Sequence, residues 1–379
     1  MKIMILAHAI RAGGGRATCT NILKALSKLD RENEYYILVP DQPEYRNLGL
    51  EGSRREIHYY RRRFGHVGRL CFDKFSLKRI AARFQPDVVW GMGGLGFIDP
   101  PCTQIVSLQN SYIVYDEKYL GPMNIETKLW LFFLRRWFKR QLPNTQLVFC
   151  QTATIQKRIH ELFDYKGKTF VTGKAVSAFV EEGDESVPQT LRPYGDKFKL
   201  LYVTRYYPHK GLEILIETLD RYREELAGVV AFTTIEPEQH PNAARLLKSI
   251  REKGLEDRVV NLGRLPQESL AAYYCNCDAL LMPTRLESFS GSYLEAMHFG
   301  LPILTSDLDF AHEVCGESAI YFDPWNAETI KEAIVKLKGN PKLSENLISR
   351  GKTQLQSYIR SWDEITENVL ENLHEIVAT

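Results

Sequence analysis

The chain has 379 residues, of which 44% are hydrophobic and 25% charged, and it carries 49 Lys and Arg against 47 Asp and Glu. This composition is that of a folded globular protein and excludes a disordered chain, a collagen-like repeat and a small disulfide scaffold. The length predicts two domains. The near-neutral total hides an asymmetry, because residues 1–180 hold 28 Lys and Arg against 15 Asp and Glu, whereas residues 181–379 hold 21 against 32.

The cysteines and the apolar runs indicate where the protein works. The seven cysteines are scattered and form no CxxC pair, which argues against a zinc site or a disulfide framework and favours a reducing compartment. The N-terminal apolar run is too short for a signal peptide, and the run at 129–134 is far shorter than the roughly 20 residues that span a bilayer. We therefore expect a cytoplasmic protein, either free or peripheral on the inner face of the membrane.

Short β-rich runs alternate with helix-length segments along the first half of the chain. Strands are expected at 1–7, 34–39, 87–90, 104–108, 146–150 and 169–171. Helices are expected at 16–29, 75–84, 126–141 and 152–163. This alternation is typical of βαβ units and predicts a parallel sheet.

An acidic stretch with Pro and Gly at 181–197 has no periodicity and is the best linker candidate, after which the alternation resumes. Strands are expected at 199–203, 229–233, 259–262, 279–282 and 303–305. Helices are expected at 212–225, 242–253, 266–275 and 291–299, with long helices from 326 onward. The pattern predicts an α/β protein with two Rossmann-like domains, 1–185 and 196–360, and a final helix at 361–379 that packs back towards the first domain. Ligands of open parallel sheets bind beyond the carboxyl ends of the strands, so we expect the site in a deep cleft between the domains.

The most informative segment is 283–302, which reads as a strand end, a loop rich in Ser and Gly, and a helix that stops at Gly300. The start of such a helix offers free backbone N–H groups to an anion. Glu287 lies on the loop and Glu295 in the second turn of the helix. A carboxylate there accepts two hydrogen bonds from a vicinal diol such as ribose. Without further context, a loop charge and a solvated helix residue are the favoured interpretation of these two residues.

The Glu-x7-Glu pattern, followed by Ala-Met-x-x-Gly-Leu-Pro, resembles the signature of family 4 retaining glycosyltransferases of the GT-B fold. The resemblance continues at 303–307, 312–314 and 319–324. Upstream, 201–205 and His209-Lys210-Gly211 are similar to the phosphate-binding segment of that family, and 261–265 to its base-side loop. The similarity is strong over 199–325 and looser over the first domain.

The resemblance implies roles for individual residues. Glu295 would hold the donor ribose, Glu287 would contact the transferred sugar, and Arg205 and Lys210 would neutralise the donor diphosphate. Such cations stabilise the charge that develops on a departing nucleoside diphosphate. The remaining donor contacts would come from Gly263, Arg264, Ser288, Phe289, Ser290 and Gly291.

Two glycine clusters follow strands of the first domain. Gly13-Gly14-Gly15-Arg16 fits neither GxGxxG nor a Walker A motif. It is either a simple turn or, as the resemblance implies, a loop facing the donor diphosphate through Gly14, Gly15 and Arg16. The second cluster, at 91–96, is either a structural turn or part of the acceptor side, where Gly93 and Gly94 would lie.

The chain departs from the family at 107–111, where many relatives carry a His near the acceptor. Gln109 and Asn110 can hydrogen-bond a sugar, but neither accepts a proton at neutral pH. This favours front-face substitution, in which the departing phosphate oxygen takes the acceptor proton, with Asp116 or Glu117 as a less favoured base. Asp307-Leu308-Asp309 reads as a turn rather than a metal site. We expect no metal and no cofactor besides the nucleotide-sugar substrate.

The segment 128–140 combines two Trp, three Phe and five cations on a predicted helix. It is either a core helix with solvated cations or an interfacial helix on anionic lipid, joined by Arg54-Arg55 and Arg61-Arg62-Arg63. A nucleic-acid partner is not expected, because no recognised binding module accompanies the charge.

The sequence therefore predicts a retaining glycosyltransferase that moves a hexose from a nucleotide-sugar to a saccharide or lipid-linked acceptor, in cell-surface polysaccharide or lipopolysaccharide synthesis. Two alternatives stay open. One is another enzyme on the same fold, a nucleotide-sugar epimerase or a phosphorylase. The other is a non-catalytic subunit that binds glycan or nucleotide.

Overall fold

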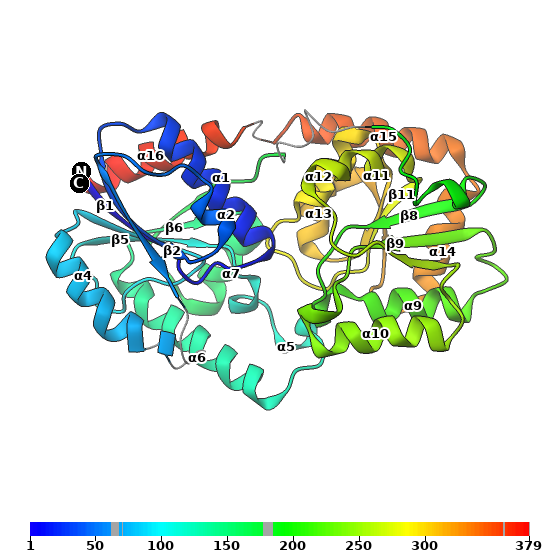
Figure 1. Cartoon of the computed structure of the whole chain (residues 1–379), viewed down its shortest axis with the longest axis horizontal. Coiled ribbons are helices and arrows are strands. Elements are labelled where there is room, and N and C mark those ends of the chain that lie inside the picture. Colours follow the sequence, from blue (N-terminus) through cyan, green and yellow to red (C-terminus); the bar gives the residue numbers. More distant parts are fainter. Residues whose placement is uncertain (62–67, 70, 177–184, 359–360, 379) are drawn as a thin grey trace. The chain divides into compact units, whose positions relative to one another are not determined.

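The computed structural model describes residues 1–61, 68–69, 71–176, 185–358 and 361–378, which form two compact units (Figure 1). The first unit comprises Met1–Tyr115, Asn124–Ala175 and Ile359–Thr379. The second comprises Asp116–Met123 and Val176–Tyr358. The predicted linker at 181–197 lies partly outside the described residues, and Arg62 and Arg63 lie outside them entirely. Its described end contains the 3-10 turn η4 (Arg192–Tyr194).

The first unit is built on a seven-stranded parallel sheet with the order β3-β2-β1-β4-β5-β6-β7. Its strands are β1 (Lys2–Leu6), β2 (Glu34–Pro40), β3 (Arg55–Tyr60), β4 (Val88–Met92), β5 (Thr103–Leu108), β6 (Leu147–Cys150) and β7 (Lys168–Val171). The sequence did not predict β3. This strand lies at the edge of the sheet, where half-exposed polar side chains replace the apolar run of an inner strand.

The longer helices of the first unit match the predicted segments except at their boundaries, whereas the short helix α2 was not predicted. They are α1 (Gly13–Leu29), α2 (Pro43–Arg46), α4 (Leu77–Phe84), α6 (Ile125–Gln141), α7 (Ala153–Phe163) and α16 (Trp362–Ala378), with a π-helical turn η1 (Phe72–Ser76) and 3-10 turns η2 (Ser111–Ile113) and η3 (Leu142–Asn144). The expected start of the first helix at Arg16 is wrong. The glycine run is the first turn of α1 rather than a loop before it, and no side chain of Ala12 caps it.

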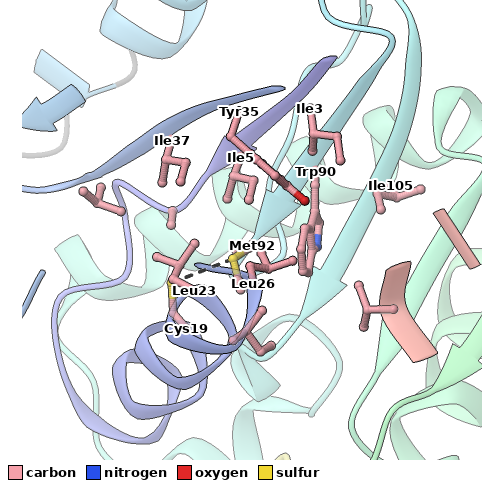
Figure 2. Packing of buried hydrophobic residues seen from close by; sticks show 14 of the residues in the cluster. Ile3, Ile5, Cys19, Leu23, Leu26, Tyr35, Ile37, Trp90, Met92 and Ile105 are labelled. Atoms are coloured by element: carbon pink, nitrogen blue, oxygen red, sulfur yellow. Dashed lines mark hydrogen bonds between the residues drawn. The ribbon is translucent and has the colours of Figure 1, made fainter. Parts of the chain in front are cut away.

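Alternating strand residues give the first sheet two apolar faces. One face presents Ile3, Ile5 and Trp90 to α1, where Cys19 lies 3.8 Å from the sulfur of Met92 (Figure 2). The opposite face presents Met4 and Leu6 to α4. The last helix, α16, packs on α1 and inserts Val369 and Leu373 into the first of these clusters. Since α16 holds five Asp and Glu and no Lys or Arg, it offsets part of the positive charge of the first unit.

The second unit is a six-stranded parallel sheet with the order β10-β9-β8-β11-β12-β13. Its strands are β8 (Phe198–Tyr202), β9 (Val229–Thr233), β10 (Val259–Asn261), β11 (Ala279–Met282), β12 (Ile303–Ser306) and β13 (Ala319–Phe322). Its helices are α5 (Glu117–Leu120), α9 (Leu212–Arg221), α10 (Pro241–Glu252), α11 (Leu270–Asn276), α12 (Gly291–Phe299), α13 (Asp309–Cys315), α14 (Ala327–Lys338) and α15 (Pro341–Leu355). Figure 1 shows α9 and α10 on one side of this sheet and α11, α12 and α15 on the other.

Both sheets reverse their strand order at one point, between β1 and β4 in the first unit and between β8 and β11 in the second. At such a point the loops from two neighbouring strands turn to opposite faces of the sheet and leave a crevice at the carboxyl ends. Within the described residues, no helix is long and apolar enough to cross a membrane.

Candidate functional site

The reversal of strand order in the second unit brings Lys210 and Glu287 together. Lys210 ends the 3-10 turn η5 (Pro208–Lys210) after β8, and Glu287 lies on the loop after β11. The Lys210 ammonium forms an ion pair with the Glu287 carboxylate. Their side chains are 15% and 13% exposed, so the pair is shielded from bulk solvent but still open to a ligand.

The two loops that carry this pair are fixed to each other. At Gly211, φ is +66°, and an added Cβ would lie 2.1 Å from the carbonyl oxygen of Pro283. The Tyr202 hydroxyl donates to the carbonyl of Lys210 at 2.8 Å. The Thr284 hydroxyl lies 3.2 Å from Oε1 of Glu287, within hydrogen-bond reach. The position of the ion pair is therefore set by the backbone as well as by charge.

Glu295 is held within α12, the helix that follows Glu287. It is 7% exposed, and the hydroxyl of Tyr274 on α11 donates a hydrogen bond of 2.7 Å to its Oε2. Burial raises the pKa of Tyr274 well above its usual value, so the phenol keeps its proton and stays a donor. At the start of α12, the side chain of Ser290 makes no capping hydrogen bond. The first-turn N–H groups are therefore available to an anion.

The other predicted donor residues of the second unit surround these loops to different degrees. Arg205 is half-exposed, and its side chain makes no hydrogen bond or ion pair with another described residue. Ser288 and Gly291 are half-buried and Ser290 is buried. Phe289 packs edge-on against Tyr358 with ring centroids 5.6 Å apart, which makes it a core residue of the loop.

Gly263 and the exposed Arg264 follow β10, two strands away from β8. Neighbouring strands lie about 4.8 Å apart, which separates β10 from β8 by roughly 10 Å. The amide of Leu262 donates to the carbonyl of Thr233 at 2.7 Å and anchors this loop to β9. The loop thus shares the carboxyl edge with the Lys210–Glu287 pair, at the outer strand of the sheet.

In the first unit, the predicted residues gather around the ends of β1, β4 and β5. Cβ atoms added at Gly15 and Gly93 would lie 3.6 Å and 3.0 Å from Ile10, and that at Gly15 would also lie 3.5 Å from Oε1 of Gln109. Gly14 approaches the buried Lys174, whose Nζ would lie 3.7 Å from an added Cβ. This places a cation beside the first turn of α1.

Three other residues of the first unit already have structural partners. The Arg16 guanidinium forms an ion pair with Glu44. The Asn110 side chain accepts from the amide of Tyr112 at 3.1 Å and caps η2. The carbonyl of Gly94 accepts from Nε2 of Gln141 at 2.7 Å.

The two carboxylates considered as a base, Asp116 and Glu117, are exposed and lie in the segment that belongs to the second unit. Asp309 begins α13, and Asp307 accepts from Nε2 of His312 at 2.6 Å. Among the residues that the structure describes, no three His, Cys, Asp or Glu gather as a metal site would require.

Sequence reasoning missed four residues beside the expected site: Thr284, Tyr274, His209 and Arg285. The amide of Arg285 donates to the carbonyl of His209 at 2.8 Å and ties the two loops together. Burial, together with the positive charges of Lys210 and Arg285, lowers the pKa of His209 well below its usual value and keeps this imidazole neutral. Thr284, Arg285 and His209 lie inside the motif segments but were given no role, so examining every residue of those segments would have found them. Tyr274 lies on another helix and has no such signal.

Residues 184–354 match the family model described as "Glycosyl transferases group 1". O-antigen chain mannosyltransferase B of Escherichia coli is 23% identical over 255 residues, which cover 63% of this chain and 63% of that protein. The serotype-specific mannosyltransferase WbdA of Escherichia coli is 23% identical over 290 residues, covering 73% of this chain and 33% of that protein. The chain thus spans less than two thirds of the length of these relatives.

Solved structures of similar shape match nearly the whole chain. Sucrose-phosphate synthase from Thermosynechococcus elongatus superposes with a TM-score of 0.77 at 18% identity, covering 100% of this chain and 99% of the other. WaaG, a glycosyltransferase involved in lipopolysaccharide biosynthesis, gives a TM-score of 0.73 at 15% identity and covers 97% and 98%. At these identities the likeness is one of fold, and that fold is GT-B.

Proposed function

We propose that this chain, whose residues 184–354 match the group 1 glycosyltransferase model, transfers a hexose from a nucleoside-diphosphate sugar to a saccharide or lipid-linked acceptor, with retention of configuration. The observation that carries the proposal is the Lys210–Glu287 ion pair at the strand-order reversal. The buried carboxylate of Glu295 lies on α12, the helix that follows the Glu287 loop. These are groups suited to a nucleotide-sugar, because a cation binds its phosphates and carboxylates accept hydrogen bonds from its hydroxyls.

In this proposal the second unit binds the donor. Glu295 accepts hydrogen bonds from the ribose hydroxyls, and Lys210 and Arg205 neutralise the diphosphate beside the first turn of α12. Glu287 accepts from hydroxyls of the hexose. When the phosphates arrive, Lys210 exchanges part of its contact with Glu287 for phosphate oxygen, so the cation is already positioned where charge develops on the leaving group.

The first unit would supply the acceptor side through Gln109, Asn110, Gly93 and Gly94, with Gly14, Gly15 and Arg16 near the diphosphate. None of the residues at 107–111 is ionisable. We therefore propose front-face substitution without a cofactor. The acceptor oxygen forms a bond to the anomeric carbon, the bond from that carbon to the phosphate oxygen breaks, and the acceptor proton passes to the departing phosphate oxygen.

The relatives suggest the donor and the pathway class. Two are named as mannosyltransferases, and one of these acts on an O-antigen chain. We propose mannose as the hexose and cell-surface polysaccharide assembly as the setting. The epimerase alternative is not favoured, because the family model and both of these relatives are described as glycosyltransferases or mannosyltransferases.

Thermal-shift screening against GDP-, UDP- and dTDP-sugars tests the proposal, because bound ligand raises stability by RT ln(1+[L]/Kd). Glu295→Ala should remove the shift, whereas Arg205→Ala should mainly slow nucleotide release in the presence of acceptor. Glu332→Ala, on the exposed side of α14, is the matched control. Unchanged binding and turnover in both site variants, or an epimerised free nucleotide-sugar as product, would refute the assignment.

We also propose that α6 rests on the inner face of a membrane. Its side chains Ile125, Leu129, Phe132 and Phe133 are 72%, 52%, 60% and 55% exposed, respectively. Cations flank this apolar face at Lys128, Arg136, Lys139 and Arg140, all exposed. Exposed aromatic side chains beside cations are the features that bind an anionic interface. Arg135 does not belong to this surface, because Nη2 donates to the carbonyl of Tyr112 at 3.0 Å.

Co-sedimentation with vesicles of phosphatidylcholine, with and without phosphatidylglycerol, measures this contact. The wild type should bind only the anionic vesicles, and Phe132→Ser/Phe133→Ser and Arg136→Ala/Lys139→Ala/Arg140→Ala should each reduce binding. Val335→Ser, which changes an exposed apolar residue on α14, is the control. Equal binding to both vesicle types would contradict the proposal.

A further inference from the structure

An aromatic pair lies at the carboxyl edge of the second sheet and is not explained by the donor site. Trp325 follows β13, and its side chain is 44% exposed. The ring of Tyr119 lies 6.1 Å from it, centroid to centroid, at an interplanar angle of 52°. The two residues are far apart in sequence, so the tertiary structure brings them together.

Tyr119 reaches this position on the short segment 116–123, which leaves the first unit after Tyr115 and returns to it at Asn124. Gly121 fixes the segment against the donor loop. An added Cβ at this residue would lie 2.9 Å from the carbonyl oxygen of Pro208, the first residue of η5. Because η5 ends at Lys210, the segment carrying Tyr119 packs on the turn that holds the proposed phosphate-binding cation.

Arg285 is the third residue of this arrangement. The guanidinium of Arg285 lies over the ring of Trp325, with Cζ 5.7 Å from the centroid. Its Nε is buried and has no hydrogen-bond partner among the described residues. Arg285 comes two residues before Glu287, and its backbone amide binds the carbonyl of His209. The arginine therefore links the aromatic pair to the Lys210–Glu287 pair.

We propose that Tyr119, Trp325 and Arg285 form a subsite for a pyranose ring of the acceptor. The inference rests on the proposed function and deepens it. A pyranose presents an apolar face of C–H groups, which packs on an aromatic ring, and equatorial hydroxyls, which accept hydrogen bonds from a guanidinium. An isolated exposed Trp needs no explanation, but here three segments converge on one exposed ring.

The exposure of the residues distinguishes acceptor from donor. Lys210 and Glu287, assigned to the donor, are 15% and 13% exposed, whereas Trp325 is 44% exposed at the rim. In addition, the segment that carries Tyr119 continues on both sides into the unit that holds the acceptor-side residues. The ring that contacts Trp325 is therefore the acceptor's, and the donor hexose stays at Glu287.

Saturation-transfer NMR on the whole chain tests the subsite, with methyl α-mannopyranoside, methyl α-glucopyranoside and methyl β-galactopyranoside as probes and GDP or UDP added. Wild type should transfer saturation to ring C–H protons of at least one probe. Trp325→Ala and Tyr119→Ala should each weaken probe binding about threefold to tenfold, the range expected for loss of one aromatic contact. Trp325→Phe should retain most of the signal. Val335→Ala, at a residue 43% exposed on α14, is the matched control.

A nucleotide arm separates this inference from the proposed function. Thermal shifts by nucleotide-sugars read the donor site and should be the same in Trp325→Ala, Tyr119→Ala and wild type. Weakened probe binding with unchanged nucleotide shifts supports the subsite. Trp325→Ala indistinguishable from Val335→Ala would overturn it, as would a rise in the KM for the nucleotide-sugar in place of the KM for the acceptor. Failure of the proposed function would appear as no nucleotide shift in any variant, wild type included.

Discussion

Tyr274 holds the Glu295 carboxylate through a hydrogen bond of 2.7 Å between two buried side chains on neighbouring helices. The phenol fixes the rotamer of Glu295 and stabilises its negative charge inside the unit. A carboxylate oriented before the ligand arrives loses little conformational entropy on binding, and that benefits affinity more than turnover.

Tyr274→Phe should weaken nucleotide-sugar binding by about 1–3 kcal/mol, the cost of removing a hydrogen bond from a buried charged acceptor. Isothermal titration with the donor measures this change. Tyr273→Phe is the matched control, because it deletes a neighbouring hydroxyl on the same helix, one that lies 2.9 Å from Oγ1 of Thr190. Equal affinity losses in the two variants would indicate that Tyr274 acts on stability alone.

The Lys210–Glu287 pair predicts different effects for its two members. Lys210→Met should lower kcat by about 10²–10³-fold, as expected when one group that stabilises the developing phosphate charge is lost. Glu287→Gln should keep the fold and lose less activity. The free energy of unfolding should fall more in Lys210→Met than in the double variant, because the single variant leaves a shielded carboxylate without its counter-ion. Additive losses of stability would contradict this coupling.

Gly211→Ala should destabilise the second unit and displace the Lys210 loop. The new Cβ would meet the carbonyl of Pro283 at 2.1 Å, in addition to the cost of about 1–2 kcal/mol for a non-glycine residue at positive φ. Gly254→Ala isolates that second cost, because this glycine has φ +59° and nothing within 4 Å of an added Cβ. Denaturant unfolding should therefore show a larger loss at Gly211, accompanied by a loss of kcat. Equal losses of unfolding free energy in the two variants would mean that the Pro283 loop moves away from the new Cβ at no cost.

His209 should make the second unit less stable in mild acid. Its folded pKa lies well below 6.5 because burial disfavours the charged ring. The unfolded chain binds this proton first, so the stabilising contribution is present above pH 6.5 and is lost as the pH falls below it. The slope is limited to about 1.4 kcal/mol per pH unit for one group. His209→Phe should flatten this slope for the second unit between pH 6.5 and 5, whereas the first unit should keep a slope of its own, because burial also lowers the pKa of His8.

Sequence patterns predicted the inner elements well and the outer ones poorly. The boundaries of β9 and α12 match the expected ranges, since β9 is a fully buried apolar run and α12 ends at a left-handed Gly300. The edge strand β3 and the early start of α1 were missed because each depends on neighbours rather than on local pattern. The segment 116–123 could not be assigned to the second unit from its sequence, because its anchor is a close approach of Gly121 to Pro208.

The candidate site shows the same division. Motif spacing identified Glu287, Glu295 and Lys210. It could not predict the ion pair between Lys210 and Glu287, because that pair forms only when β8 lies beside β11 in the sheet. Motif spacing also could not predict the hydrogen bond from Tyr274 to Glu295, which depends on how α11 packs against α12. The charge pattern likewise grouped Arg135 with the exposed cations of α6, although its side chain is used to hold the carbonyl of Tyr112.

The packing of α16 on the first unit has a consequence for folding of the nascent chain on the ribosome. Val369 and Leu373 complete a cluster whose other members include Ile3, Ile5 and Cys19. Synthesis of the first unit therefore starts before that of the second unit and ends after it, because part of the first core stays open until α16 has left the ribosome. The second unit can close in the meantime, so the nascent chain would present the uncovered face of α1 to chaperones throughout that interval.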